Sequence, residues 1–391
     1  MEEMKHPQTD HAPSLLQLFG SFLRLGTTAF GGPAMIAYIR KLAVEKNRWI
    51  DEKAARDGIA LCQTIPGATA MQMTAYVGLR ARGVKGAAAS FIGFGLPAFL
   101  FMTILSALYI QAHTLPQVIS AFNGLQAIVV GLVANATLSF GKTSIKSRKN
   151  ILNAGVAAVM FWFKMNPILV ILFAGLFGWI LYGKQTPPHG LDSNKRPYPE
   201  SSLFLLLLAT VVGFALLYFL DQGLFDLAAL MSRIDLFAFG GGFASVPLMF
   251  HEIVEVRRWM DSPTLLNGIA LGQVTPGPIV ITATFVGYVL YGFWGGLIGT
   301  IAIFLPSFLI VVAIVPYFDR LRSSVHFRSV VTGVLCSFVG LLLTVTVRFA
   351  FDIPWNFPRV VLASGALIAL LLKVDILWVV VIGTVISLIV L

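Results

Sequence analysis

The chain has 391 residues, of which 57% are hydrophobic and 12% are charged, and its mean hydropathy is +0.84. A water-soluble protein needs a largely polar surface, so this composition excludes a soluble globular fold and makes lipid the solvent for most of the chain. The net charge of +10 arises from Lys and Arg in short loops between apolar runs, a pattern that sets membrane orientation and does not indicate nucleic-acid binding.

The first thirteen residues are polar and the next segment contains Arg24, so we expect the first helix to be retained and not cleaved as a signal. Apolar runs then recur, each about long enough to cross a hydrocarbon core of roughly 30 Å as a helix. Backbone groups in lipid must be satisfied within their own element, and the runs lack the alternation of barrel strands. The fold is therefore predicted to be an all-α polytopic membrane protein. Examples are the runs 91–110, 203–220, 295–315 and 374–391.

An internal repeat emerges when the sequence is shifted by 209 or 210 residues. The polar stretch 184–202 separates the two copies, and the apolar run 203–220 belongs to neither. We therefore predict an N-terminal repeat at 14–183, a polar linker plus a connecting transmembrane helix at 184–223, and a C-terminal repeat at 224–391. Matched positions include Arg24 with Arg233, Phe30-Gly31-Gly32 with Phe239-Gly240-Gly241, Glu45, Arg48, Trp49 and Asp51 with Glu255, Arg258, Trp259 and Asp261, Gln63, Pro66 and Gly67 with Gln273, Pro276 and Gly277, Gly78 with Gly287, and Pro97 with Pro306.

Each copy is predicted to contain a segment with a glycine break, a segment with a Pro-Gly break, two plain spans and a final apolar pair. With an even number of crossings per copy, the single linker helix makes the two repeats inverted. If every segment crosses, the six Lys or Arg of 40–56 fall opposite the clusters at 80–85 and 142–149, against the preference for cations on the cytoplasmic side. If both broken segments dip in and return, all three clusters share one side. Inversion holds in both topologies, and the residues alone leave open whether the segments are broken spans or re-entrant.

Inverted repeats with broken helices bind substrate near the membrane midplane, at unwound backbone between half-helices. The hydroxyl before proline at Thr64 and Thr275 is typical of a helix N-terminus, and converging N-termini would hold a tetrahedral oxyanion. The amides of Gln63 and Gln273 can donate to such an anion or cap loose backbone. The predicted substrate-binding residues at the breaks are Gly31, Gly32, Pro33, Gln63, Thr64, Pro66 and Gly67 in the first copy, and Gly240, Gly241, Gly242, Gln273, Thr275, Pro276 and Gly277 in the second.

Arg24 and Arg233 each precede the phenylalanine of a glycine break by six residues, inside apolar segments where a cation is costly. Our hypothesis is that they neutralise a dianion. The alternatives are that Arg233 pairs with Asp226 or Asp235, that Arg24 reaches the surface, and that Gly and Pro only ease helix packing. Duplication of the whole set favours binding. Asp226 and Asp235 are the chief carboxylates within apolar stretches and are candidates for proton coupling.

Other chemistries find little support in the sequence. The six histidines show no ligand spacing, so no metal site is predicted. Cys62 and Cys336 lie in apolar surroundings and are interpreted as packing residues. Gly141-Lys142-Thr143 resembles the end of a phosphate-binding loop but lacks its earlier glycine, so no nucleotide or other cofactor is predicted, and the chain is predicted not to be an enzyme.

The two glycine breaks of FGGP and FGGG type, the Arg-Trp pairs, Gln-x-x-Pro-Gly in both copies and a Leu-Pro near the third segment together resemble the chromate ion transporter family. The resemblance covers essentially the whole chain. It implies a multi-pass protein of the bacterial inner membrane that exports chromate, with sulfate as a related ligand and the halves antiparallel. The first copy departs from the usual Pro-Gly-Pro because Ala68 follows Gly67, whereas Pro276-Gly277-Pro278 is intact.

Energetics favour export. A dianion leaving a negative interior gains about 2.3 kcal/mol per charge per 100 mV, or roughly 4.6 kcal/mol for two charges. We therefore hypothesise a secondary exporter driven by membrane potential or a proton gradient. Uptake of sulfate or another oxyanion, and a passive anion channel, are the alternatives. The lipid bilayer is the expected surrounding, no nucleic-acid partner is predicted, and the sequence is compatible with a homo-oligomer without requiring one.

Overall fold

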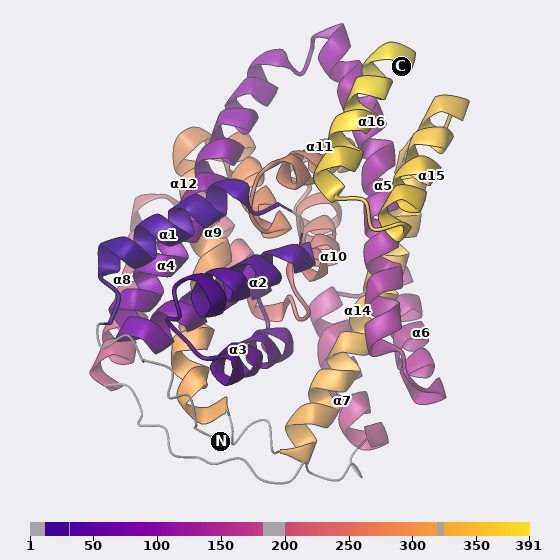
Figure 1. The fold of residues 1–391 in the computed structure, drawn as a ribbon. Helices are drawn as coiled ribbons and strands as arrows, with labels where there is room; N and C mark the ends of the chain where they lie inside the picture. The colour runs from indigo at the N-terminus through magenta and orange to yellow at the C-terminus, as the bar shows by residue number, and fades with distance from the viewer. Residues whose placement is uncertain (1–11, 31, 183–199, 319–323) are drawn as a thin grey trace, which may run out of the picture.

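The computed structural model describes residues 12–30, 32–182, 200–318 and 324–391, and every helix or strand assigned in those ranges is a helix (Figure 1). The all-α prediction is confirmed, whereas most of the predicted polar linker lies outside the described residues. The first copy holds α1 (Leu15–Thr28), α2 (Gly32–Arg40), η1 (Lys41–Lys46), α3 (Glu52–Thr64), α4 (Thr69–Ala112), α5 (Pro116–Ser144), α6 (Arg148–Trp162) and α7 (Pro167–Tyr182), and α8 (Glu200–Leu220) follows. The second copy holds α9 (Gln222–Phe237), η2 (Gly242–Ala244), α10 (Ser245–Met249), η3 (Phe250–Val256), α11 (Ser262–Val274), η4 (Ile279–Ile281), α12 (Thr282–Ile314), η5 (Val315–Tyr317), α14 (Val325–Asp352), α15 (Phe357–Leu371) and α16 (Ile376–Val390).

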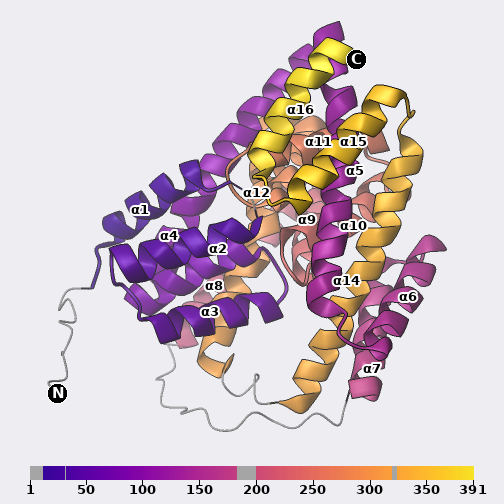
Figure 2. The ribbon, with the colours of Figure 1, turned by 45° about the vertical axis from the view of Figure 1, so that its right-hand side comes forward.

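The broken segments of the first copy are hairpins. From the glycine break, α2 runs back in the direction from which α1 came (Figures 1 and 2). Beyond the Pro-Gly break, α4 itself reverses at Arg82 and Gly83, where Gly83 has a φ of +64°. Its two parts then pack against each other, with the Ser90 hydroxyl donating to the Thr74 carbonyl at 2.8 Å. The stretch 69–81 is thus the returning arm of a hairpin, and only 84–112 continues across the molecule.

The second copy repeats this reversal within α12. Tyr291 and Gly292 leave the helical conformation, and Gly292 has a φ of +60°. The hydroxyls of Thr284 and Thr300 lie 2.6 Å apart across the folded helix. A Cβ on Gly287 would lie only 2.1 Å from a backbone oxygen on the facing arm, so the matched glycine is needed for the close approach.

The duplicated Glu-x-x-Arg-Trp-x-Asp segments form the turns between hairpins. Arg48 turns the chain with a φ of +50°, and Asp51 accepts a hydrogen bond from the backbone N–H of Ala54 at 2.6 Å, capping α3. Trp49 packs on Phe22 with ring centroids 6.0 Å apart. The aspartate therefore caps the helix that follows the turn. Arg258 and Asp261 repeat the turn and the cap in the second copy, with the N–H of Thr264 as donor.

The final apolar pairs exchange partners between copies. Helices α6 and α7 of the first copy pack on α14 of the second, and α15 and α16 pack on α5. Glycines allow the contacts to be close: a Cβ on Gly178 would lie 2.7 Å from the Cα of Gly333, and one on Gly131 would lie 2.7 Å from the Ala363 carbonyl oxygen. The two copies are therefore interlocked and do not form separate bundles.

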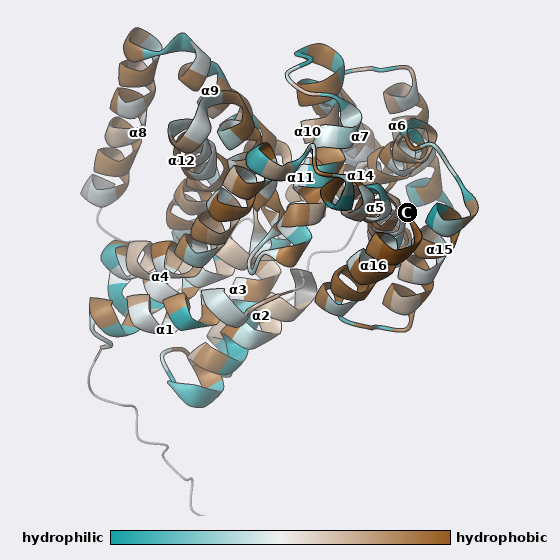
Figure 3. Cartoon of the chain, turned by 90° about the horizontal axis from the view of Figure 1, so that it is seen from above, coloured by the Kyte–Doolittle hydropathy of each residue, from teal (hydrophilic) through white to brown (hydrophobic). Residues whose placement is uncertain are grey.

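Five helices in the described residues are long and apolar enough to cross a membrane. Hydrophobic residues dominate these helices (Figure 3), and large apolar side chains on them are exposed, such as Leu205 and Phe219 on α8, which are 62% and 83% exposed. Such a surface is stable only in lipid. Two of the five belong to each copy and one is α8, so the copies are inverted as predicted. The five ranges are Thr69–Ala112, Pro116–Ser144, Ser202–Leu220, Ile279–Tyr317 and Val325–Asp352.

Most of the cations of the first copy gather at one end. The turns before α3 and α6 lie in the lower half of the view, whereas the turn between α4 and α5 lies at the top, close to the C-terminus (Figure 1). The stretches 40–56, 80–85 and 142–149 carry the Lys and Arg of this end, and the opposite loop 111–116 carries none. Of the two topologies left open, the structure matches the re-entrant one.

Candidate functional site

The four breaks meet where the two copies touch. The backbone N–H of Gly67 donates to the Ala238 carbonyl at 2.9 Å, and the N–H of Gly277 donates to the Ala29 carbonyl at 3.0 Å. Pro66 also forms an isolated bridge with Phe239. Each Pro-Gly break thus binds the glycine break of the other copy, and the two contacts are equivalent under the symmetry that relates the copies.

The second glycine break lies between the starts of two helices. A Cβ on Gly241 would lie 3.2 Å from the Thr69 hydroxyl at the start of α4, and one on Gly242 would lie 2.6 Å from Ile279, where η4 leads into α12. Gly240 and Gly241 have φ of +92° and +103°, which side-chain-bearing residues rarely adopt. Three helical starts, at Thr69, Gly242 and Ile279, therefore come together. Their first N–H groups have no partner within the helix and carry partial positive charge, which suits an anion.

The threonines of the Pro-Gly breaks do not have the predicted role. Thr64 ends α3 and Thr275 follows α11, and their hydroxyls donate to carbonyls of the preceding turns, Leu61 at 2.8 Å and Gly272 at 3.0 Å. The prediction that they cap the following helices is wrong, because those helices begin only after the glycine. Gly67 and Gly277 supply the turn with φ of +116° and +112°, and Pro66 and Pro276 precede them.

The two glutamines occupy different surroundings despite matched sequence positions. Gln63 is exposed, whereas Gln273 is 8% exposed and its side-chain Nε2 has no hydrogen-bond partner among the described residues. A buried donor without a partner is costly unless something accepts from it. Gln273 is therefore the better candidate to donate to a bound anion.

The two arginines also differ. Arg24 is exposed and makes no ion pair within the described residues. The guanidinium of Arg233 lies 2.5 Å from Glu252 Oε1, and the Glu252 side chain is only 5% exposed. The alternative that Arg233 pairs with Asp226 or Asp235 is therefore wrong. Glu252 neutralises most of the charge that Arg233 was expected to offer a dianion.

The remaining candidates are placed as follows. Asp226 is exposed near the start of α9, whereas Asp235 is fully buried near its end. Helix α2 begins at Gly32 with Pro33 in its first turn. Gly31 lies outside the described residues. Cys62 and Cys336 are buried free thiols.

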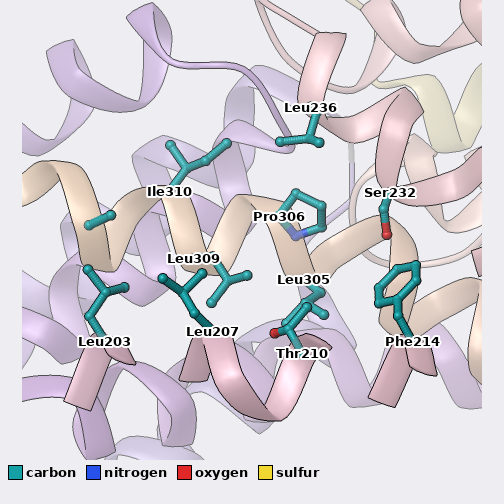
Figure 4. A pocket seen from close by; sticks show the side chains of 11 residues that line it. Leu203, Leu207, Thr210, Phe214, Ser232, Leu236, Leu305, Pro306, Leu309 and Ile310 are labelled. Carbon is teal, nitrogen blue, oxygen red and sulfur yellow. The ribbon is translucent and has the colours of Figure 1, made fainter. Parts of the chain in front are cut away.

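The crevice beside α8 is unsuited to an ion. It has a volume of about 420 Å³ and lies between α8, α9 and α12 (Figure 4). Its only side-chain oxygens belong to Thr210 and Ser232, and both hydroxyls donate to backbone carbonyls of Leu206 and Ala302. An anion there would find no free donor from these side chains. The remaining lining residues are Leu203, Leu207, Phe214, Leu236, Leu305, Pro306, Leu309, Ile310 and Ala313.

Sequence reasoning missed the polar residues that surround the first Pro-Gly break. Ser307 accepts a hydrogen bond from the N–H of Ala68 at 2.9 Å, and its own N–H donates to Asp235 at 2.8 Å. Gln72 donates to the Pro66 carbonyl. A search for residues shared by both copies could not reveal these residues. A search for positions at which the copies differ could, because Ser307 of the second copy matches Ala98 of the first.

Comparison with known proteins assigns the family. The chromate transporter family matches residues 16–179 and again 225–388. An uncharacterised transporter of Methanocaldococcus jannaschii is 42% identical over 96% of this chain and 94% of its own length. Chromate transport proteins of Cupriavidus metallidurans and Pseudomonas aeruginosa are 30% and 31% identical, over 92% and 85% of this chain and 88% and 80% of theirs.

No solved structure matches the chain. The family match covers both inverted copies, and each matched stretch contains its glycine break, its Pro-Gly break and its final apolar pair. The family comprises transporters, so the chain is a membrane transporter and not an enzyme. The repeated helices, the shared breaks and the relatives together place this chain in the chromate transporter family.

Proposed function

We propose that this chain exports chromate from the cytoplasm across a bacterial inner membrane. The observation that carries the proposal is the meeting of three helical starts, at Thr69, Gly242 and Ile279, where the copies touch. N–H groups at helix starts have no partner within their own helix, so they offer hydrogen bonds and partial positive charge without a formal cation. A tetrahedral oxyanion can accept from several directions at once, and the named substrate of the Cupriavidus and Pseudomonas relatives is such an ion.

The side chains have distinct roles in this proposal. Gln273 donates its unpartnered amide to the anion, and Arg24 attracts it electrostatically. Arg233, paired with Glu252, supports the site and adds little net charge. The backbone of the breaks supplies most of the binding, from Gly31, Gly32, Pro33, Gln63, Thr64, Pro66 and Gly67 in one copy and Gly240, Gly241, Gly242, Thr275, Pro276 and Gly277 in the other.

The charges of the loops support the orientation. The end with the cation-rich stretches 40–56, 80–85 and 142–149 is assigned to the cytoplasm. A chromate dianion that moves outward then gains about 4.6 kcal/mol at 100 mV, so the membrane potential alone can drive export. Uptake would oppose the same potential.

Transport in oriented vesicles tests the proposal. Inverted vesicles that contain the protein should accumulate labelled chromate when the interior is made positive, and unlabelled sulfate should compete because it has the same shape and charge. Empty vesicles are the control. Accumulation only in right-side-out vesicles would indicate oxyanion uptake, and single-channel currents without accumulation against a gradient would indicate a passive channel. Either result would contradict export.

A further inference from the structure

A buried polar cluster lies beside the first Pro-Gly break. Asp235 and Ser307 of the second copy and Gln72 of the first are each 0% exposed. The N–H of Ser307 donates to Asp235 Oδ2 at 2.8 Å, and the N–H of Ala68 donates to Ser307 Oγ at 2.9 Å. Gln72 Nε2 donates to the carbonyl of Pro66. The cluster therefore ties the first Pro-Gly break to α9 and α12 of the other copy.

Two oxygens in the cluster have no donor among the described residues. Asp235 Oδ1 and Gln72 Oε1 are both buried without a hydrogen-bond partner there. A Cβ on Gly67 would lie 3.2 Å from Asp235 Oδ2 and 2.7 Å from Gln72 Nε2, so the carboxyl and the amide flank the same point. An ionised carboxylate with an unpaired oxygen is unfavourable at a position that is 0% exposed. A proton on Oδ1 makes that oxygen a donor, and the amide oxygen of Gln72 is an acceptor that lacks one.

Among the described residues, no fixed cation compensates Asp235. On its own helix, Arg233 is bonded to Glu252 and Asp226 is exposed. Helix α12 contains no acidic or basic residue. The first charged residue of α4 is Arg80, which lies too far along the helix from Gln72 to contact the cluster. Asp235 makes no ion pair within the described residues. A negative charge on Asp235 would therefore have no ion-pair partner among the described residues.

The cluster exists in one copy only. The positions of Asp235 and Ser307 correspond to Gly26 and Ala98 in the first copy. A Cβ on Gly26 would lie 2.5 Å from the Phe94 carbonyl oxygen, so a side chain does not fit there. Ala98 faces Gly277 with a methyl group. The second Pro-Gly break therefore has no counterpart to the carboxyl.

We propose that Asp235 carries the proton that this transporter exchanges for its oxyanion, an inference that rests on the proposed export. With the proton bound, the neutral carboxyl, Ser307 and Gln72 hold the first Pro-Gly break and the start of α4 in place. Loss of the proton leaves a carboxylate that must be hydrated, which separates the break from Ser307. One proton therefore enters as the anion leaves, and only the O–H bond of the carboxyl forms and breaks.

The test is Asp235→Asn in proteoliposomes, with Asp226→Asn as the matched control on the same helix. Asn keeps the shape and is permanently neutral. We expect Asp235→Asn to retain chromate–chromate exchange and to lose at least tenfold of the net flux driven by a pH gradient at zero potential, while Asp226→Asn keeps both. Full pH-gradient-driven flux in Asp235→Asn would overturn the proposal. So would a wild-type flux driven by a sodium gradient and indifferent to pH.

A second measurement needs no chromate and so separates failure of the proton site from failure of the proposed substrate. Ala68→Cys places a thiol at a residue that is 0% exposed, in a background with Cys62→Ala and Cys336→Ala. We expect the rate of maleimide labelling to rise more steeply with pH in the protein with Asp235 than in the Asp235→Asn variant. The variant serves as the control because the thiol itself titrates in both proteins. Identical pH profiles in the two proteins would contradict a proton-controlled break.

Discussion

The two Pro-Gly breaks share a backbone and differ in chemistry. Gly67 and Gly277 have φ of +116° and +112°, and each donates its N–H to the glycine break of the other copy. Around Gly67 lie the hydroxyl of Ser307, the amide of Gln72 and the carboxyl of Asp235. In the part of the chain that the structure describes, a Cβ on Gly277 would meet within 4 Å only the Ala98 methyl. Duplication has preserved the shape of the cradle, and divergence has placed ionisable chemistry on one side of it. The proposed exchange of the oxyanion for a proton relies on this difference.

The largest effect is expected from a side chain at the first break. Gly67→Ala would place its Cβ 2.1 Å from Ser307 Oγ and force an unfavourable φ. Backbone strain of about 1–3 kcal/mol and overpacking of about 1–3 kcal/mol should add, and thermal unfolding in detergent should report the loss. Gly277→Ala should cost less, because its Cβ would lie 2.8 Å from a methyl group. Gly20→Ala, which meets nothing within 4 Å, is the neutral control, and equal stability in all three would refute the packing described.

A second contrast separates the arginines. Arg233→Ala leaves Glu252 buried without its closest cation, which should destabilise the fold by about 3 kcal/mol, and Glu252→Gln in the same chain should restore most of it. Arg24→Ala should leave stability unchanged and raise the KM for chromate. If Arg233→Ala lowers only transport and Arg24→Ala lowers only the melting temperature, the roles are reversed.

The two glutamines are expected to differ in their effect on the affinity for chromate. Gln273→Leu removes a buried donor that nothing else in the described residues uses, so the Kd for chromate should rise by about tenfold. Gln63→Leu should leave the Kd unchanged because Gln63 is exposed. Equilibrium dialysis of purified protein measures both. Equal losses in the two variants would mean that the site treats the copies alike.

The smallest effect is expected when the sequence of the first Pro-Gly break is changed to that of the second, Pro-Gly-Pro. Ala68→Pro suits a φ of −75° and removes only the N–H that donates to Ser307, a bond worth about 0.5–1.5 kcal/mol. Flux driven by a pH gradient should fall a few-fold while chromate–chromate exchange persists. Pro278→Ala should change neither rate, since Ala98 offers no acceptor. A strong effect of Pro278→Ala would contradict the asymmetry.

Repetition explains why much of the architecture could be predicted. Matched pairs such as Gly78 with Gly287 and Trp49 with Trp259 recur because both copies need the same close contacts and turns. The loop cations limited the topology to two alternatives, and the structure separated them. The threonine error arose because Thr64 and Thr275 precede proline, but the glycine that follows delays the next helix. Pairing of Arg233 with Glu252 joins two hairpin arms, which no local pattern encodes.

The chemistry of the candidate site was less accessible to sequence reasoning. Ser307 and Gln72 lie far apart in sequence, and both flank Gly67 only because the copies interlock. Asp235 was selected as a carboxylate in an apolar stretch, but its partners depend on tertiary contacts. The useful signal lay in positions where the copies disagree, such as Gly26 against Asp235 and Ala98 against Ser307.

The most direct test of the central claim is a structure of the protein determined with bound chromate. The oxyanion is expected where the starts of α4, η2 and η4 meet, within hydrogen-bond distance of backbone N–H groups near Thr69, Gly242 and Ile279 and of the Gln273 amide. An ion held elsewhere, such as beside α8 or at the loop arginines, with the meeting point of the breaks filled by side chains, would contradict the account.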